Sequence, residues 1–207
     1  MSKAYQVVRD FEEAIAEWTG AKYGVAVSSC CNAIFLCLQY CKQKYPTCIT
    51  NPFIPTRTYP GVPMSIINSG FNIDWSKYAW KGLYKLDPFP IFDCALRFKK
   101  DMYLCNSLMC LSFHHQKHLP IGRGGMILTD DKDAYDWLKM ARFDGRQEKP
   151  LSEDNATICG WNMYMTPEQA ARGLVLFDSI KDKDLPDLKV EDQNYPDLST
   201  WEVFKNE

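Results

Sequence analysis

The order of apolar segments predicts an α/β fold of three layers, with helices on both faces of a mainly parallel sheet. Short apolar runs alternate with amphipathic runs along the chain, which is the pattern of strands joined by crossover helices. Connections such as residues 130–160 are long enough to hold a crossover helix. With 207 residues, 46% of them hydrophobic and 24% charged, the chain has the composition of one globular domain rather than of a disordered protein.

Four segments show helical periodicity or the residues that start a helix. Phe11, Ile15 and Trp18 fall on one face of a helical projection, which predicts an amphipathic helix near the N-terminus. Thr166 followed by Pro167 predicts the start of another helix, because threonine is a good N-cap and proline fits the first turn. The expected helices span residues 8–19, 33–42, 132–142 and 166–180.

Four short apolar segments have the length of buried strands. They cover residues 23–27, 90–92, 103–111 and 126–129. After residue 180 the sequence becomes rich in Asp, Lys and Pro, so we expect residues 1–180 to form the main domain and residues 181–207 a short, loosely attached tail. The mixed charges of residues 181–187 predict a solvated stretch.

Composition and charge argue against several classes of protein. A formal net charge of −2 gives no basic surface for nucleic acid or an anionic membrane, so neither is an expected partner. The apolar runs are too short to span a bilayer and the charged N-terminus does not resemble a signal peptide, so we expect a cytoplasmic protein. Nine cysteines without a CxxC pair, and three histidines within one short segment, predict reduced thiols and no metal site.

Polar groups follow three of the expected strands. Residues 28–32 come directly after one strand and open a helix, Asp93 ends another, and Ser112 and Lys117 follow a third. The carboxyl ends of parallel strands converge on one edge of a sheet, so these groups are expected to meet. Residues 28–32 would then form an anion site at a helix N-terminus, although these residues alone favour a simple cap by a serine or asparagine. The alternative for Asp93 is a cap at the start of a turn.

An anion site, a buried carboxylate and a loop lysine together suit pyridoxal phosphate. The phosphate needs N–H and hydroxyl donors, the pyridine nitrogen stays protonated beside a carboxylate, and the aldehyde reacts with a lysine amine. These residues by themselves leave other kinds of site open.

Seven segments in the same order resemble the DegT/DnrJ-type sugar aminotransferases, which are pyridoxal-phosphate enzymes of the aspartate aminotransferase fold, fold type I. The segments are residues 11–38, 55–59 (PTRTY), 91–95 (IFDCA), 111–118 (LSFHHQKH), 124–126 (GGM), 142–146 (RFDGR) and 160–166 (GWNMYMT). The resemblance covers about residues 8–180. It implies a minimal large domain of that fold, with residues 181–207 as a remnant of the small domain.

The resemblance implies a role for each matching residue. Lys117 would bind the cofactor aldehyde and move the proton between the substrate Cα and the cofactor C4′, and Asp93 would hold the pyridine nitrogen. Ser112 would donate to the phosphate and Tyr59 would stack on the ring, with an ordinary core aromatic as the alternative for Tyr59. Asn162 would reach the phosphate of a neighbouring subunit in a homodimer with shared active sites, or else be a turn asparagine.

Cys30, Cys31 and Ala95 complete the expected cofactor-binding set, and two of them depart from the family pattern. Cys30-Cys31 stands where the family has Gly-Thr, and a thiol is a poorer donor than a hydroxyl. Leu96 replaces a polar residue.

The expected reaction is amino transfer from a glutamate-like donor to a keto group on a nucleotide-linked sugar. Other pyridoxal chemistry, such as elimination or decarboxylation, and a degenerate, non-catalytic binding protein are the alternatives. A form this compact would fit a viral genome.

Overall fold

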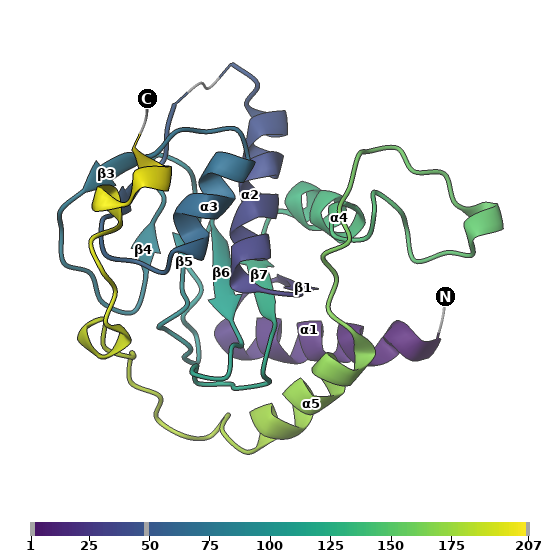
Figure 1. Ribbon diagram of the computed structural model, residues 1–207. Coiled ribbons are helices and arrows are strands. Elements are labelled where there is room, and N and C mark those ends of the chain that lie inside the picture. Colours follow the sequence, from purple (N-terminus) through teal and green to yellow (C-terminus); the bar gives the residue numbers. More distant parts are fainter. Residues whose placement is uncertain (1–2, 48–49, 206–207) are drawn as a thin grey trace.

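Figure 1 shows the computed structural model of the chain, which describes residues 3–47 and 50–205. The α-helices are α1 (Gln6–Thr19), α2 (Cys30–Lys44), α3 (Gly61–Asn68), α4 (Lys132–Ala141) and α5 (Pro167–Asp178). The strands are β1 (Tyr23–Val27), β2 (Phe53–Pro55), β3 (Asp74–Ser76), β4 (Tyr84–Lys85), β5 (Ile91–Asp93), β6 (Leu108–Ser112) and β7 (Gly125–Thr129). Short 3₁₀ helices are η1 (Lys3–Tyr5), η2 (Leu151–Glu153), η3 (Glu191–Gln193), η4 (Leu198–Thr200) and η5 (Glu202–Phe204). In the part of the chain described here, no helix is both long enough and apolar enough to cross a bilayer.

Five strands form one sheet in the order β1-β7-β6-β5-β4. β5 and β6 are parallel, whereas β7 is antiparallel to both β1 and β6, and β4 is antiparallel to β5. The expectation of a mainly parallel sheet is therefore wrong, and the sheet within the described residues is mixed. The reason is the connection after β6, which returns through a loop at residues 113–124 without a helix and so lays β7 antiparallel beside it.

Although the pairing is mixed, three strands run in the same direction. β1 and β6 flank β7 and are both antiparallel to it, so they run parallel to each other, and β5 runs parallel to β6. Val27 at the end of β1 and Ser112 at the end of β6 both lie opposite Gly125. The carboxyl ends of β1, β5 and β6 therefore share one edge of the sheet, as the sequence predicted.

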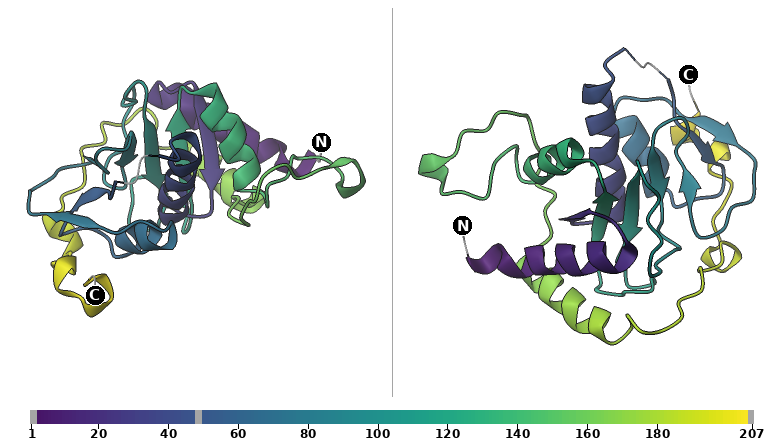
Figure 2. Two further views of the ribbon diagram at one scale, coloured as in Figure 1. Left: turned by 90° about the horizontal axis from the view of Figure 1, so that it is seen from above. Right: turned by 180° about the vertical axis from the view of Figure 1, so that it is seen from behind.

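The sheet is buried on both faces, which confirms the three-layer α/β arrangement. Successive side chains of β6 and β7 alternate between two apolar cores, so that Cys110 and Ile127 pack on the side of α2, while Met109 and Met126 pack on the side of α1 and α5. Figure 2 (left) shows the strands between α2 on one side and α1 on the other. Strands buried on both faces read as continuous apolar runs, which is how these segments look in the sequence.

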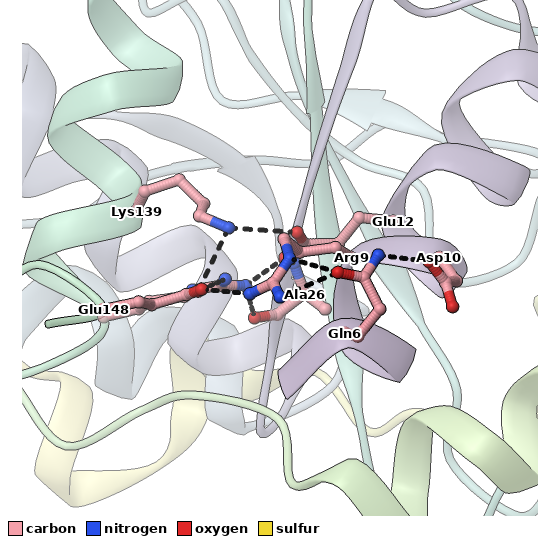
Figure 3. A network of polar contacts seen from close by, with 8 residues as sticks. Gln6, Arg9, Asp10, Glu12, Ala26, Lys139 and Glu148 are labelled. Atoms are coloured by element: carbon pink, nitrogen blue, oxygen red, sulfur yellow. Dashed lines mark hydrogen bonds and ion pairs between the residues drawn. The ribbon is translucent and has the colours of Figure 1, made fainter. Parts of the chain in front are cut away.

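A buried network of charges joins α1 to α4 and to the loop that follows (Figure 3). Glu12 accepts hydrogen bonds from Ala26 N at 2.8 Å and Lys139 Nζ at 3.2 Å, and it pairs with the buried Arg142. Glu148 in the loop pairs with Lys139 at 3.3 Å and with Arg142 at 3.7 Å. The network fixes the start of the long loop between α4 and α5, which projects away from the sheet in Figure 1.

Residues 181–205 run along the side of the molecule from α5 to β3 (Figure 1). The Asp187 side chain is only 3% exposed and pairs with Arg97 Nη2 at 2.7 Å and Lys99 Nζ at 3.2 Å. Further along, Leu198 is fully buried. The expectation of a solvated stretch up to Asp187 is therefore wrong at that residue, because its partners lie about ninety residues away, where local composition gives no sign of them.

Candidate active site

A cavity of about 1000 Å³ opens at the sheet edge where β1, β5 and β6 end. Its volume is at the upper end of the usual range for ligand sites, so it can hold a cofactor together with a second molecule. Seven of the eight expected site residues line it: Cys30, Cys31, Tyr59, Asp93, Ala95, Ser112 and Lys117. The structure thus brings together groups that are separated by almost ninety positions in the sequence.

The N-terminus of α2 forms one wall of this cavity. Ser29 is the N-cap, and its Oγ accepts a hydrogen bond from Asn32 N at 3.1 Å, so the simple cap considered for this segment is present. Cys30 and Cys31 occupy the first two helical positions, where backbone N–H groups have no partner within the helix. Gly125 permits the close approach of β7, because a Cβ there would lie 2.6 Å from Cys30 N. A cap and an anion site are therefore compatible at this helix end.

Asp93, at the end of β5, is 3% exposed and lines the cavity. Its Oδ1 accepts a hydrogen bond from Ala95 N at 2.9 Å, and Cys30 Sγ lies 3.9 Å away. Burial raises the pKa of Asp93, while the Ala95 N–H, the Tyr84 hydroxyl and the Lys117 amine act to lower it. Among the described residues Asp93 forms no ion pair. A cationic group placed beside it would offset the cost of burying this carboxyl as a carboxylate.

Lys117 lies on a tight turn in the loop between β6 and β7. Its backbone N donates to His114 O at 2.9 Å. Phe113, Leu119 and Ile121 are buried on either side of the turn and anchor the loop to the core. The lysine is therefore held at the cavity by a loop of defined conformation.

The Lys117 amine is partly withdrawn from water. Its Nζ donates a hydrogen bond to Gln193 Oε1 at 3.2 Å. Burial lowers the pKa of Lys117, whereas the charges of Asp93 and Cys30 act to raise it. A lowered pKa increases the fraction of neutral amine, which is the form that attacks a carbonyl.

Ser112 and Tyr59 complete the part of the cavity that the sequence predicted. Ser112 is partly buried at the end of β6, where its Oγ accepts a long hydrogen bond from His114 N at 3.5 Å. Tyr59 lies before α3 and is 55% exposed. Its exposure rules out the core-aromatic alternative and places its ring at the rim of the cavity.

Asn162 is the one expected site residue that does not line the cavity. It is exposed, and its Nδ2 donates to Asp144 Oδ2 at 3.1 Å. It also pairs across the base of the α4–α5 loop with Phe143. Its expected contact with a neighbouring subunit stays a prediction.

The sequence reasoning missed the residues that the C-terminal segment contributes. Gln193, Asn194 and Tyr195 all line the cavity. Burial raises the pKa of Tyr195, and the charge of Asp93, which lines the same cavity, raises it further. The only local signal is a turn-forming Asn and a Tyr-Pro dipeptide, which predict a bend but not its location.

Arg123 was also missed as a site residue. It lines the cavity between two glycines, and its Nε donates to Ser28 O at 3.2 Å. An arginine beside a helix N-terminus adds positive charge where an anion would bind.

The departures from the family pattern have distinct local consequences. Burial raises the pKa of Cys31 to about 11, so this thiol stays neutral near pH 7 and is a weak hydrogen-bond donor. Leu96 is fully buried and does not line the cavity, so the polar group lost there is replaced by core packing.

The sequence matches the DegT/DnrJ/EryC1/StrS aminotransferase family over residues 1–72 and 102–184, and the chain belongs to this family. The match leaves out residues 73–101, which contain Asp93, so the assignment of Asp93 depends on its position in the cavity.

Solved structures with the same fold include three aminotransferases. Helicobacter pylori PseC, an aminotransferase of pseudoaminic acid biosynthesis, is 16% identical with a TM-score of 0.68, over 84% of this chain and 58% of its own. The sugar aminotransferase CalS13 from Micromonospora echinospora is 16% identical with a TM-score of 0.68, over 84% of this chain and 60% of its own. A DegT DnrJ EryC1 StrS aminotransferase from Brucella abortus is 17% identical with a TM-score of 0.67, over 86% of this chain and 60% of its own. The chain therefore matches about three fifths of each of these proteins, and the likeness confirms the fold type I large domain.

Proposed function

We propose that this protein binds pyridoxal phosphate and transfers an amino group from a glutamate-like amino acid to a keto group on a nucleotide-linked sugar. The observation that carries the proposal is the pairing of a buried carboxyl, Asp93, with a partly buried amine, Lys117, in one cavity beside the N-terminus of α2. Membership of an aminotransferase family supports the reaction, and the description of CalS13 as a sugar aminotransferase supports the substrate class.

The residues of the cavity fit the three polar parts of this cofactor. The first N–H groups of α2, with Ser112 and Arg123, offer donors for a phosphate. Asp93 is a buried carboxyl that forms no ion pair with the described residues, and it suits a protonated pyridine nitrogen. Lys117 provides the amine for the aldehyde. When bound, the cofactor supplies the electron sink for reactions at the α-carbon of an amino acid.

The chain's own side chains hold and move protons around that group. Asp93 would hold the ring nitrogen, and its buried carboxylate would favour the protonated form of that nitrogen. Lys117 would hold the cofactor through its amine and, once released, would carry a proton as general base and acid, a role that its lowered pKa favours. Tyr59 lies at the rim, where its ring is available to stack on a planar ligand.

A homodimer with shared active sites follows as part of the same proposal. Asn162 is exposed at the base of a loop that projects from the molecule, which is consistent with a residue that serves a neighbouring subunit (Figure 1). We also propose residues 1–180 as the cofactor domain, residues 181–207 as the remnant of a small domain, and a cytoplasmic location.

Cofactor capture on Lys117 tests the proposal. Purified protein incubated with pyridoxal phosphate should gain visible absorbance, and borohydride should fix the cofactor on the peptide that contains Lys117, identified by mass spectrometry. Lys117→Ala should lose this adduct, whereas Lys100→Ala, at an exposed position, should retain it. A protein that stays colourless, or an adduct that survives in Lys117→Ala, would contradict the assignment and favour a non-catalytic binding protein.

The reaction type is tested by a half-reaction. Adding glutamate to the loaded protein should bleach the visible band as the amino group passes to the cofactor, and adding a keto acid should restore it. Failure with every amino donor tried would reject amino transfer while leaving cofactor binding intact.

A further inference from the structure

A segment near the C-terminus lines one side of the cavity through residues 192–196 and is fixed by hydrogen bonds both before and after them. We call residues 186–198 the strap. On one side Asp187 pairs with Arg97 through two hydrogen bonds of 3.0 and 2.7 Å. On the same side Pro186 O lies 2.8 Å from His118 Nε2. Leu188 N donates a hydrogen bond to Leu96 O, in the turn after β5, at 2.9 Å.

The other end of the strap is held by the loop that carries Tyr59. Arg57 Nη1 donates to Tyr195 O at 3.0 Å, and Leu198 N donates to Thr56 O at 2.8 Å. Leu198 is fully buried, so the strap ends in the apolar core. A segment anchored by a buried carboxylate at one end and a buried leucine at the other has a defined course.

Between these anchors the strap forms part of the cavity wall. Gln193 Oε1 accepts the hydrogen bond of Lys117 Nζ, and Asn194 takes a left-handed backbone conformation with φ of 51° that turns the chain back. Tyr195 follows and lines the same cavity as Asp93 and Tyr59. The strap therefore contacts Lys117 through Gln193 and lines the cavity that also contains Asp93.

The strap lies outside the part of the chain that matches the family, which ends at residue 184. The strap residues in these contacts therefore lie outside the matched segments, whereas their partners Arg57 and Lys117 lie within them.

We propose that the strap is a built-in wall of this site, in which Gln193 positions the Lys117 amine and Tyr195 covers the Asp93 end of the cavity. The proposal deepens the function proposed above, since it assigns two further residues to the same site. A ligand that enters the cavity meets an amide and a phenol from the strap, in addition to the groups at the sheet edge.

The position of Gln193 is tested through the titration of Lys117 in protein to which no cofactor has been added. The pH dependence of reductive methylation at Lys117, followed by peptide mass spectrometry, gives the pH at which half of the Lys117 amine is protonated. We call this pH the midpoint. Gln193→Glu places a carboxylate opposite the amine and should raise this midpoint by about one pH unit, a tenfold change in proton affinity. Gln193→Ala removes the acceptor from the charged amine and should lower it.

A substitution at the neighbouring residue distinguishes the effect of a direct contact with Lys117 from the effect of added negative charge in the cavity. Asn194→Asp adds the same charge one residue away and should shift the midpoint by no more than half as much. The groups Asp93, Cys30 and His114 also act on Lys117, but they are unchanged in every variant, so only differences between variants are compared. An unchanged midpoint in Gln193→Glu, or an equal shift in Asn194→Asp, would overturn the role of Gln193.

The covering role of Tyr195 is tested by the accessibility of a thiol. Cys31 and Tyr195 line the same cavity, whereas Cys105 is exposed and does not line it. Tyr195→Ala should increase the alkylation rate of Cys31 relative to Cys105 by about tenfold or more, and Tyr195→Phe should leave the ratio near that of the unaltered protein. A ratio unchanged in Tyr195→Ala would show that the strap does not cover the cavity.

The anchor provides a third readout. Arg97→Ala should speed tryptic cleavage at Lys189 in the strap by about tenfold, while Lys85→Ala, which removes an exposed ion pair, should not. An equal rate in both variants would contradict the fixed course of the strap.

None of these measurements uses pyridoxal phosphate. A protein that fails to bind the cofactor but shows the expected shift at Lys117 would refute the proposed function and leave the strap proposal standing, and the converse result would do the opposite.

Discussion

Replacing Arg142 with alanine should strongly destabilise the fold, because Arg142 is buried and pairs with both Glu12 and Glu148. The side chains of Arg142 and Glu12 are 3% and 5% exposed, and they form an ion pair. Arg142 also donates to Ala26 O and pairs more loosely with Glu148. Its removal leaves the Glu12 carboxylate buried with Lys139 at 3.2 Å as its remaining cation.

The magnitude follows from burial rather than from the number of contacts. Breaking a buried ion pair by removing one partner costs about 3–5 kcal/mol, because the other charge loses its compensation. For a chain of this length each kcal/mol corresponds to about 2–4 °C, so the midpoint of thermal unfolding should fall by roughly 6–20 °C. A loss of this size is a large fraction of a typical total stability of about 5–15 kcal/mol.

Thermal and urea unfolding followed by circular dichroism measure the effect. Lys132→Ala is the matched control, because it removes an exposed ion pair with Asp136 on α4 and should cost less than about 1 kcal/mol. The double substitution Glu12→Gln with Arg142→Met should cost less than the sum of the two single changes, since neither charge is then left alone. A loss below about 1 kcal/mol in Arg142→Ala would refute the reasoning and indicate that water reaches the pair.

Four further outcomes are expected. Thr166→Ala should lower stability by about 1 kcal/mol in chemical unfolding, because the Thr166 side chain caps α5 in a capping box. Gly145→Ala should reduce the yield of folded protein and its melting midpoint, since residue 145 has φ of 76° and a Cβ there would lie 2.0 Å from a backbone carbonyl oxygen. Burial would raise the pKa of Glu148, but Lys139 and the two nearby arginines lower the pKa overall. The contribution of Glu148 to stability should therefore be present above the unfolded-state pKa of about 4.3 and be lost as the pH falls through the lower folded-state pKa. Glu148→Gln should flatten that part of the curve of stability against pH. Among the described cysteines, Cys105 and Cys159 should react first with a thiol reagent in the native protein, because they are the exposed ones, and equally fast labelling of buried thiols would contradict the packing.

The parts of the fold that the sequence predicted are those specified by neighbouring residues. The N-cap and proline at the start of α5 and the apolar stripe of α1 are local features, and the structure has helices at both places. The apolar run of β1 was predicted with the bounds that the structure shows, Tyr23–Val27. Seven of the eight expected site residues line one cavity. They meet because β1 and β6 run in the same direction, so that their carboxyl ends share one edge of the sheet even though β7 lies antiparallel between them.

The apolar character of the strands alone could not predict which strands pair or whether they pair parallel or antiparallel. Strands buried on both faces have the same apolar character in parallel and antiparallel neighbours, so β7 gave no sign that it lies antiparallel between β1 and β6. The loop at residues 113–124 was the available signal, because a connection without a helix favours an antiparallel return.

The strap shows why one part of the cavity wall was missed. Its fixed points are single residues, Asp187 and Leu198, whose partners Arg97 and Thr56 lie about ninety and one hundred and forty positions earlier in the chain. A charged residue in an Asp- and Lys-rich stretch reads as solvated unless its partner is known, and one leucine between polar residues has no periodicity. The sheet edge is specified by local motifs, whereas the wall facing it is specified by isolated long-range contacts. The residues that line the cavity from the strap are therefore the ones that sequence patterns are least able to identify.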